Sequence, residues 1–290
     1  MPGPAILQRL ESTNIEQVRF PKQFPVSEMW LFLQTPPARG AFNMALDEEL
    51  MSRAREAGAW VVRVYGWSTP TLSLGRNQLA RGGYDLPRLA ESGIDVVRRP
   101  TGGRAILHHR EITYSVAAPV DMAGDLRESY GRINRLLVAA LTALGVTGAE
   151  VIGESIRADR VADGAQPGLL PCFDHPSVGE ITVGGRKLVG SAQWRSEGAL
   201  LQHGSILVED DQRQLSAFLV AAMPAVPKPA TLLEVLGRSP SQEEMADALL
   251  AAIRSLEDPA ARIMDDQSDL LERANQRAAH YLDDGWTWRR

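Results

Sequence analysis

The chain has 290 residues, of which 44% are hydrophobic and 23% are charged, as expected for a globular protein that can bury a sizeable core. Its formal net charge of −5 argues against a dedicated DNA- or RNA-binding protein, because such proteins usually carry an overall basic charge. The single cysteine excludes an internal disulfide and a cysteine-based metal cluster, and it favours a reducing, cytoplasmic setting.

The sequence shows no pattern of export or of membrane insertion. Residues 1–20 lack a long apolar core behind a basic start, so we expect no signal peptide. No stretch approaches about 18 consecutive apolar residues, so we also expect no membrane span.

The first half of the chain mixes expected helices and strands. Residues 1–27 are polar and punctuated by prolines, and we interpret them as an N-terminal extension. The composition of residues 42–57 favours a helix, whereas residues 59–67 and 94–100 are rich in β-branched side chains and predict strands. Residues 131–145 predict an amphipathic helix, since apolar residues recur at intervals of three and four before a glycine that is placed to end it.

The second half begins with strands and returns to helices. Two strand-like runs within residues 178–194 flank a Gly-Gly pair, which predicts a hairpin with a two-residue turn, and residues 198–209 predict another strand. The spacing of Ser241 and Glu244 is typical of a capping box, and it predicts a helix that ends near residue 256. A last helix is expected over about residues 267–282.

These elements divide the chain into three parts. We expect an extension over residues 1–27, a central mixed α/β domain over residues 28–212, and a small helical C-terminal extension over residues 213–290. The sequence contains no internal repeat and none of the common nucleotide or hydrolase motifs, such as GxxxxGK[ST], GxGxxG, HExxH or GxSxG.

The first candidate for a binding site is the stretch RRPTGGRAILHH, residues 98–109. Gly102 and Gly103 leave backbone N–H groups uncovered, and Arg99 and Arg104 beside them are able to form charge-assisted hydrogen bonds with a ligand oxygen. A tight turn with solvated arginines explains the same residues equally well, so the sequence alone leaves both interpretations open.

The second candidate is Cys172, which lies in a polar, proline-bounded loop ahead of the predicted hairpin. A lone cysteine is most often a small buried hydrophobic residue. Lys187 follows on a strand of that hairpin, and a neighbouring ammonium lowers the pKa of a thiol by stabilising the thiolate. A drop of one to two pKa units would raise the reactive fraction roughly tenfold, so a nucleophilic role competes with the structural one.

The histidines complete the candidates. His203, which precedes Gly204 on a predicted strand, fits a base or a hydrogen-bonded strand histidine. The pair His108-His109 has no cysteine or acidic partner at a ligand-like spacing, so we expect no metal site.

Three strings in order carry a resemblance to a known family: RRPTGGRAILH with EITYSV, then GRKLVGSAQWR, then LQHGSILVE. Together they resemble the biotin/lipoate protein ligase and transferase superfamily over about residues 28–250. The resemblance implies an α/β (α+β) catalytic domain with mixed, mainly antiparallel sheets flanked by helices. The string PCFDHPS before GRKLVGSAQ is similar to the cysteine-dependent octanoyl-acyl carrier protein:protein N-octanoyltransferases within that superfamily.

The resemblance also implies roles and partners. Cys172 would carry an acyl thioester and Lys187 would lower its pKa, with no cofactor or metal. The donor would be octanoyl-acyl carrier protein. The acceptor would be a lipoyl-domain protein such as the glycine cleavage H protein or a dehydrogenase E2 subunit, with neither nucleic acid nor membrane as a partner. Many relatives carry an acid where this chain has His109.

The same resemblance, together with the lack of bulky side chains at the glycines, places an acyl pocket around the Gly-Gly turn and the hairpin. Ile106 and Leu74 are its expected apolar walls, and the arginines are expected to contact acidic carrier proteins. The residues expected to bind the substrate or its acyl chain are Arg99, Gly102, Gly103, Arg104, Ala105, His108, Gly190, Ser191, Ala192, His203 and Gly204.

Three alternatives stay open at this point. An ATP-dependent lipoate or octanoate ligase would share the glycine turn and the lysine, but it would make an acyl-adenylate. An amidotransferase would move octanoyl between lipoyl-domain proteins and would also use a cysteine. A non-catalytic member would only bind an acyl ligand or its carrier.

Overall fold

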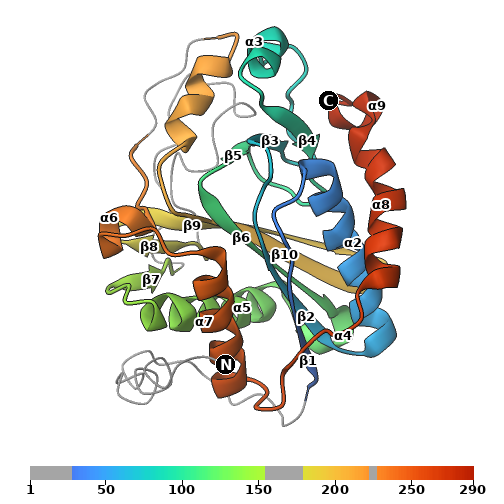
Figure 1. Cartoon of the computed structure of the whole chain (residues 1–290), viewed down its shortest axis with the longest axis vertical. Helices are drawn as coiled ribbons and strands as arrows, with labels where there is room; N and C mark the ends of the chain where they lie inside the picture. Colours follow the sequence, from blue (N-terminus) through green and yellow to red (C-terminus); the bar gives the residue numbers. More distant parts are fainter. Residues whose placement is uncertain (1–27, 154–178, 222–226) are drawn as a thin grey trace.

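The computed structural model of the protein describes residues 28–153, 179–221 and 227–290 (Figure 1). Cys172 and the expected extension 1–27 lie outside the described residues. No helix in the three described ranges is long and apolar enough to cross a membrane.

The main feature is an eight-stranded sheet with the order β11-β1-β2-β6-β10-β9-β8-β7. Only the pairs of β1 with β2 and with β11 are parallel, and every other pair in this sheet is antiparallel. The expected mixed, mainly antiparallel fold is therefore confirmed. The strands are β1 (Trp30–Gln34), β2 (Trp60–Tyr65), β6 (Glu111–Pro119), β7 (Ala149–Val151), β8 (Ile181–Val183), β9 (Arg186–Ser196), β10 (Ala199–Leu207) and β11 (Arg262–Ile263).

A second sheet of three strands stands beside the main one and carries the Gly-Gly turn. Its order is β4 (Asp95–Arg98), β3 (Thr71–Leu74) and β5 (Ile106–His108). The short helix α3 (Leu86–Glu91) and the 3-10 helix Gln212–Phe218 pack against it around a small apolar core. Leu74, expected to line an acyl tunnel, is buried in this core instead and does not face the pocket described below, so that expectation is wrong.

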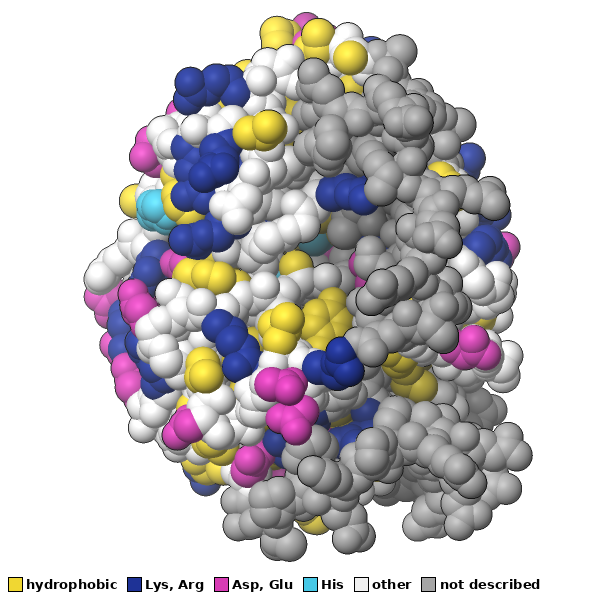
Figure 2. Space-filling model, turned by 180° about the vertical axis from the view of Figure 1, so that it is seen from behind, with side chains coloured by type: hydrophobic (Ala, Val, Ile, Leu, Met, Phe, Trp, Pro, Cys, Tyr) yellow, Lys and Arg dark blue, Asp and Glu magenta, His cyan; other side chains and the backbone are white. Residues whose placement is uncertain are grey.

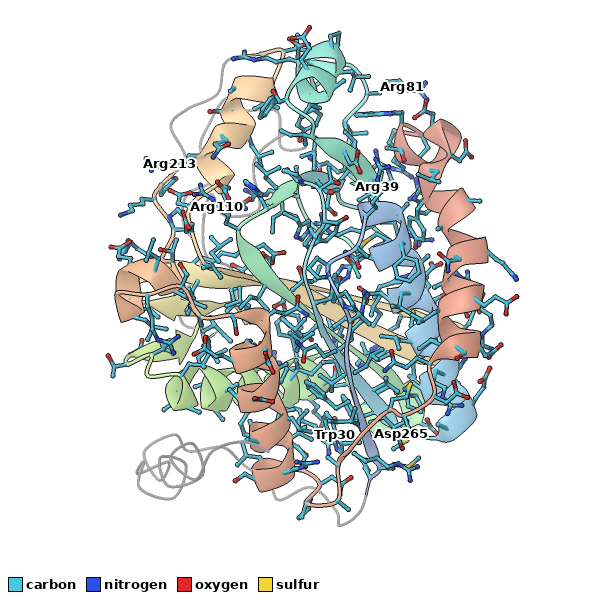
Figure 3. The ribbon with its side chains drawn as sticks, viewed as in Figure 1. Trp30, Arg39, Arg81, Arg110, Arg213 and Asp265 are labelled. Atoms are coloured by element: carbon cyan, nitrogen blue, oxygen red, sulfur yellow. The ribbon has the colours of Figure 1, made fainter. Side chains whose placement is uncertain are left out.

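Helices cover both faces of the large sheet (Figure 1). Side chains alternate between the faces of a strand, and β1 shows the result. Trp30 and Phe32 enter the core beneath α5 (Leu126–Ala143) and α7 (Gln242–Leu256), while Leu31 and Leu33 enter the core beneath α2 (Gly40–Ala57) and α8 (Ser268–Leu282). Figure 3 shows side chains filling the space between the sheet and the helices, with Trp30 labelled on β1.

The local signals in the sequence mostly led to the right elements. The turn between β8 and β9 consists of Gly184 and Gly185, both at positive φ, and Ser241 closes the predicted capping box with Glu244. Helix α5 starts at Leu126 rather than at residue 131, because Asp125 and Glu128 form a second capping box. The sequence interpretation did not use that signal.

The chain after residue 212 supplies the predicted helices and also a strand. Besides α7 and α8, this part of the chain contains α6 (Leu232–Leu236) and α9 (Asp284–Thr287). One further short helix, α4 (Val120–Ala123), follows β6 in the first half of the chain. Strand β11 joins the edge of the large sheet beside β1. The domain boundary near residue 212 stays a prediction, but this part of the chain contributes to both cores.

Candidate active site

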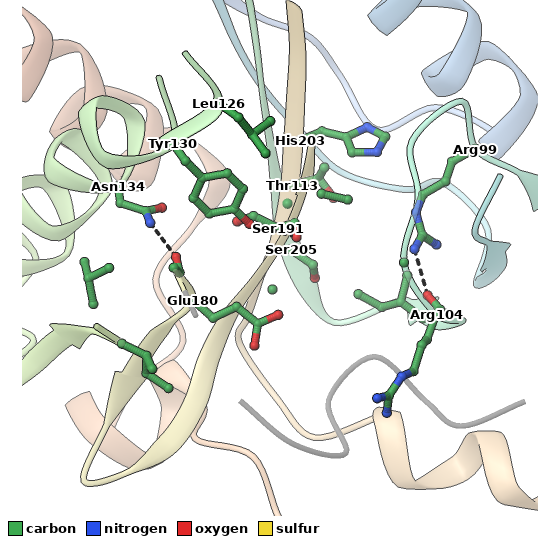
Figure 4. Close-up of a pocket in the computed structure, with 18 of the residues that line it drawn as sticks. Arg99, Arg104, Thr113, Leu126, Tyr130, Asn134, Glu180, Ser191, His203 and Ser205 are labelled. Atoms are coloured by element: carbon green, nitrogen blue, oxygen red, sulfur yellow. Dashed lines mark hydrogen bonds between the residues drawn. The ribbon is translucent and has the colours of Figure 1, made fainter. Parts of the chain in front are cut away.

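A cavity of about 1000 Å³ opens between α5, the hairpin β8–β9, β10 and the Gly-Gly turn (Figure 4). This volume is at the upper end for small-molecule sites. Most of the predicted pocket residues line it: Arg99, Gly103, Arg104, His108, Gly190, Ser191, Ala192, His203 and Gly204. Gly102, Ala105 and Lys187 are not in its wall, and whether the lining residues bind substrate stays a prediction.

The Gly-Gly turn is shaped by another part of the protein. A Cβ on Gly75, at the end of β3, would lie 1.9 Å from the carbonyl oxygen of Gly103, so the two backbones pass each other in contact. Gly103 has φ +94, a conformation that side chains disfavour. One side of the turn thus packs on Gly75, and Gly103 also lines the cavity, so a ligand-binding role for the glycines stays a prediction.

Two arginines of the turn, Arg98 and Arg99, donate hydrogen bonds to backbone carbonyl oxygens. Arg98 is fully buried and donates to the carbonyl oxygens of Gly75 (2.6 Å) and Thr287 (2.8 Å). Arg99 donates to the carbonyls of Gly102 (2.8 Å) and Arg104 (2.7 Å). Arg98 and Arg99 are buried, so for these two residues both the expected contact with acidic carrier proteins and the alternative of solvation are wrong. Arg104 is partly exposed, and its expected contact stays a prediction.

Burial lowers the pKa of the Arg98 guanidinium. Its removal from water, with the charges of Arg289 and Arg290 nearby, lowers the pKa of Arg98 to about 10. Carbonyl oxygens accept hydrogen bonds from its Nε and from one terminal nitrogen, which offsets part of the cost of burying the guanidinium. On the opposite side of the molecule from Figure 1, basic and acidic side chains are interspersed, with no continuous basic surface among the residues drawn in colour (Figure 2).

Lys187 is buried in the hairpin and pairs with an acid that the sequence analysis missed. Its Nζ lies 2.5 Å from Oε1 of Glu180, and only 2% of Lys187 is exposed. A buried ammonium requires such a partner, because its desolvation is costly. Glu180 in turn lines the cavity, so the pair places a positive charge directly behind the wall of the pocket.

His203 belongs to a buried polar network centred on Asp47 of α2. Its Nδ1 lies 3.0 Å from Oδ2 of Asp47, and its Nε2 lies 2.6 Å from Oγ1 of Thr101. Arg63, fully buried, donates to the other carboxylate oxygen of Asp47 at 3.0 Å. His203 is thus a hydrogen-bonded strand histidine, as the plainer interpretation holds, and it also lines the cavity.

Asp47 remains ionised in this setting. Burial alone would raise its pKa, but the hydrogen bond from His203 and the charge of Arg63 outweigh that effect and lower the pKa below its ordinary value. Ser115 and Tyr65 donate to the same carboxylate at 2.8 and 2.9 Å. Asp47 on α2 therefore organises one wall of the site from beneath the sheet.

His108 and His109 point to different surroundings. The His108 ring stacks on Trp67 at 3.9 Å between centroids, and its Nδ1 lies 3.3 Å from Oε1 of Glu111. Burial lowers the pKa of His108 even though Glu111 opposes the shift, so the ring is neutral near pH 7. His109 is exposed and pairs with Asp211 at 3.2 Å, outside the cavity wall, beside Arg110 (Figure 3).

The described residues contain no group of three or more histidine, cysteine or acidic side chains that could hold a metal ion.

The far end of the cavity is formed by the first turns of α5, which were not predicted from the sequence to belong to the site. There Tyr130 donates through its hydroxyl to the carbonyl oxygen of Ser191 at 2.9 Å, and Asn134 donates to the carbonyl of Gly179 (Figure 4).

Comparison with known proteins gives a consistent result. Residues 39–254 match the family described as the lipoyl protein ligase A/B catalytic domain. The chain is 38% identical over 278 residues to the octanoyltransferase LipM of Kyrpidia tusciae, covering 91% of this chain and all of that one.

Solved structures share the fold. A lipoate-protein ligase A bound with ATP aligns with a TM-score of 0.69 at 23% identity, over 90% of this chain and 98% of its own. A bipartite lipoate protein ligase of Thermoplasma acidophilum, described with its E2 lipoyl domain, has a TM-score of 0.69 at 21% identity over 90% and 97% of the two chains. Likeness at this level of identity establishes the fold alone.

Proposed function

The chain belongs to the lipoyl protein ligase A/B catalytic domain family and is an acyltransferase, and on this basis we propose that it moves an octanoyl group from octanoyl-acyl carrier protein to a lipoyl-domain lysine through a thioester on Cys172. The observation that carries the proposal is the 38% identity, over the whole length of the relative, to a protein named octanoyltransferase.

The cavity supports an acyl substrate. A methylene group takes up roughly the volume of a liquid water molecule, about 30 Å³, so an octanoyl group needs about 240 Å³. The cavity of about 1000 Å³ holds this group with space for the arm that delivers it. Burial contributes about 0.8 kcal/mol for each methylene, or about 5 kcal/mol for the chain, which favours an apolar acyl group over a short polar one.

The first step is a thioester exchange. The Cys172 thiolate attacks the octanoyl carbonyl carbon, the new C–S bond forms, and the bond to the carrier thiol breaks, so the carrier leaves as a thiolate that takes up a proton. In the second step the neutral amine of the acceptor lysine attacks the same carbon. The amide C–N bond forms, the bond to Cys172 breaks, and the proton lost from the amine restores the thiol. No phosphate bond is consumed, and covalent catalysis divides the transfer into two easier steps.

Lys187 is the proposed source of positive charge for this chemistry. As a cation it would stabilise the Cys172 thiolate and the oxyanion that develops on the acyl carbonyl. Glu180 holds its ammonium at the pocket wall. The pairing adds one feature to the sequence-based role, since the Glu180 carboxylate gives the buried ammonium a counter-charge.

The proposal is tested by intact-protein mass spectrometry after mixing the protein with octanoyl-acyl carrier protein in the absence of ATP. We expect one octanoyl mass increment on the protein, and its loss when a lipoyl domain is added, with the increment appearing on the lipoyl domain. A protein that stays unmodified with a donor shown to be competent contradicts the proposal.

Replacing Lys187 by alanine should slow the alkylation of Cys172 by iodoacetamide near pH 7 about tenfold, because the thiolate loses its neighbouring cation. The rate of alkylation is measured against pH for the wild type and the variant. Replacing Lys228, an exposed lysine paired with Glu234, gives a matched control that should not change the rate. If Lys187→Ala leaves the alkylation profile unchanged, the lysine has no role in lowering the pKa of the thiol.

A further inference from the structure

Among the described residues that line the cavity, one buried polar side-chain atom has no hydrogen-bond partner. Asn134 on α5 is 1% exposed, and its Oδ1 meets no donor among the described residues. The side chain lines the cavity beside Tyr130 (Figure 4). Because a buried carbonyl oxygen without a donor is costly to the folded protein, its retention at a binding cavity points to a ligand that supplies the donor.

The orientation of the Asn134 amide is fixed by the backbone that it touches. Its Nδ2 donates to the carbonyl oxygen of Gly179, so the end of the amide that remains is the acceptor. Gly179 itself is held in place, because its N–H donates to the carbonyl of Ile152 and the N–H of Ile152 donates to that of Glu180, both at 2.9 Å. A flip of the Asn134 amide would place its Oδ1 against the carbonyl oxygen of Gly179, and two acceptors would then face each other. The site therefore requires an N–H or O–H group from the ligand.

The same backbone links Asn134 to the proposed reacting centre. Gly179 accepts from Asn134, and the next residue, Glu180, holds the ammonium of Lys187. One turn earlier on α5, Tyr130 donates to the carbonyl of Ser191 in the opposite wall. A donor group bound at Asn134 would thus lie between α5 and the hairpin, close to the residues that hold Lys187 (Figure 4).

We propose, on the basis of the proposed function, that Asn134 Oδ1 accepts a hydrogen bond from the amide N–H nearest the thioester in the pantetheine arm of the acyl donor. This nitrogen is separated from the thioester sulfur by two methylenes, which suits a site next to the residue that holds Lys187. The cavity exceeds the need of an octanoyl group by several hundred Å³, enough for such an arm. Asn134 is then a residue that selects amide-bearing thioester donors.

An acceptor lysine also carries N–H groups, but its nitrogen must lie at the acyl carbon during the second step. To distinguish the pantetheine amide from the acceptor lysine as the hydrogen-bond donor, acylation of Cys172 and transfer to the lipoyl domain are measured independently. The rate of acylation of Cys172 is followed with octanoyl-pantetheine and with the octanoyl thioester of ethanethiol, which has no amide. The second step is followed by adding a lipoyl domain to the acylated protein after the donor has been removed.

Asn134→Ala should lower the second-order rate constant of acylation by octanoyl-pantetheine about tenfold, the effect expected for one hydrogen bond to a buried acceptor, and should leave the ethanethiol thioester unaffected. Thr142→Ala is the matched control on the same helix, because the Thr142 hydroxyl donates to the carbonyl oxygen of Val138 within α5 and Thr142 does not line the cavity. It should change neither rate.

The wild type alone provides a second measurement that does not depend on the folding of the variant. An octanoyl-pantetheine analogue with an ester in place of that amide should acylate the wild type about tenfold more slowly than the amide. Equal rates overturn the proposal. So do equal losses with both donors in Asn134→Ala, which would make Asn134 a purely structural residue, or a loss confined to the second step. If neither donor acylates the wild type, the proposed function fails and the assignment of Asn134 fails with it.

Discussion

Replacing Cys172 by alanine should reduce the rate of octanoyl transfer from octanoyl-acyl carrier protein to a lipoyl domain at least about a thousandfold, because removal of a covalent nucleophile leaves only binding to accelerate the reaction. The rate is measured by the octanoyl mass increment on the lipoyl domain with time. The octanoyl adduct on the enzyme should be absent from the variant at all times. A thermal unfolding curve of the variant shows whether the loss arises from chemistry or from folding.

The outcome also separates the transferase from the ATP-dependent ligase. A ligase activates free octanoate as an adenylate, so incubation with octanoate, ATP and magnesium would modify the lipoyl domain, and Cys172→Ser would still be active. We expect no modification under these conditions and no activity from Cys172→Ser with either donor. Full activity of Cys172→Ser would remove the thioester from the mechanism. An octanoyl amidotransferase would instead use an octanoylated lipoyl domain as the donor.

Replacing Asp47 by alanine should destabilise the protein by about 3–5 kcal/mol, because the fully buried Arg63 would lose its counter-charge. His203 would also lose the acceptor for its Nδ1. The free energy of unfolding is measured by denaturant titration. Asp95→Ala is a suitable control, since Asp95 also pairs with an arginine, Arg39, but at the surface, where the expected cost is less than about 1 kcal/mol.

The same network should make the protein sensitive to acid. The pKa of Asp47 is lowered in the folded protein, so the unfolded chain binds a proton more readily than the folded one. Its contribution to stability is complete above the unfolded pKa of about 4 and is lost as the pH falls through the folded value. Asp47→Ala should lack this part of the pH dependence. A variant within about 1 kcal/mol of the wild type at pH 7 would show that Arg63 finds another partner, and would refute the expected role of the pair.

The sequence predicts the elements well where the signal is local. The Gly184-Gly185 turn and the Ser241 capping box each depend on a few adjacent residues, and both form as predicted. The mainly antiparallel sheet was expected from the resemblance to a family, since the order of its strands depends on contacts between distant segments. Strand β11 was missed because two residues on an exposed edge carry no periodic pattern.

The partners of the candidate residues could not be derived from the sequence. In the sequence, Arg98 and Arg99 beside two glycines suggest an anion-binding site at the surface. Only the fold shows that both side chains donate to backbone carbonyl oxygens instead. Lys187 lies opposite Thr182 in the hairpin, and Glu180, just before β8, reaches its ammonium diagonally past a shift in the register, so the predicted turn alone does not give this pair. Asp47 likewise meets His203 from a helix beneath the sheet, and nothing in the spacing of the two residues connects them.

The position of β11 has a consequence for how the protein is made. Strand β1 lies between β2 and β11, and the backbone N–H of Trp30 bonds Asp258, 228 residues later in the chain. During synthesis, β1 therefore cannot pair with β11 until residues 262–263, close to the end of the chain, have left the ribosome. Contacts between such distant segments slow folding and leave an exposed strand edge in the meantime. We expect the nascent protein to expose this edge of β1 until residues 262–263 have been synthesised.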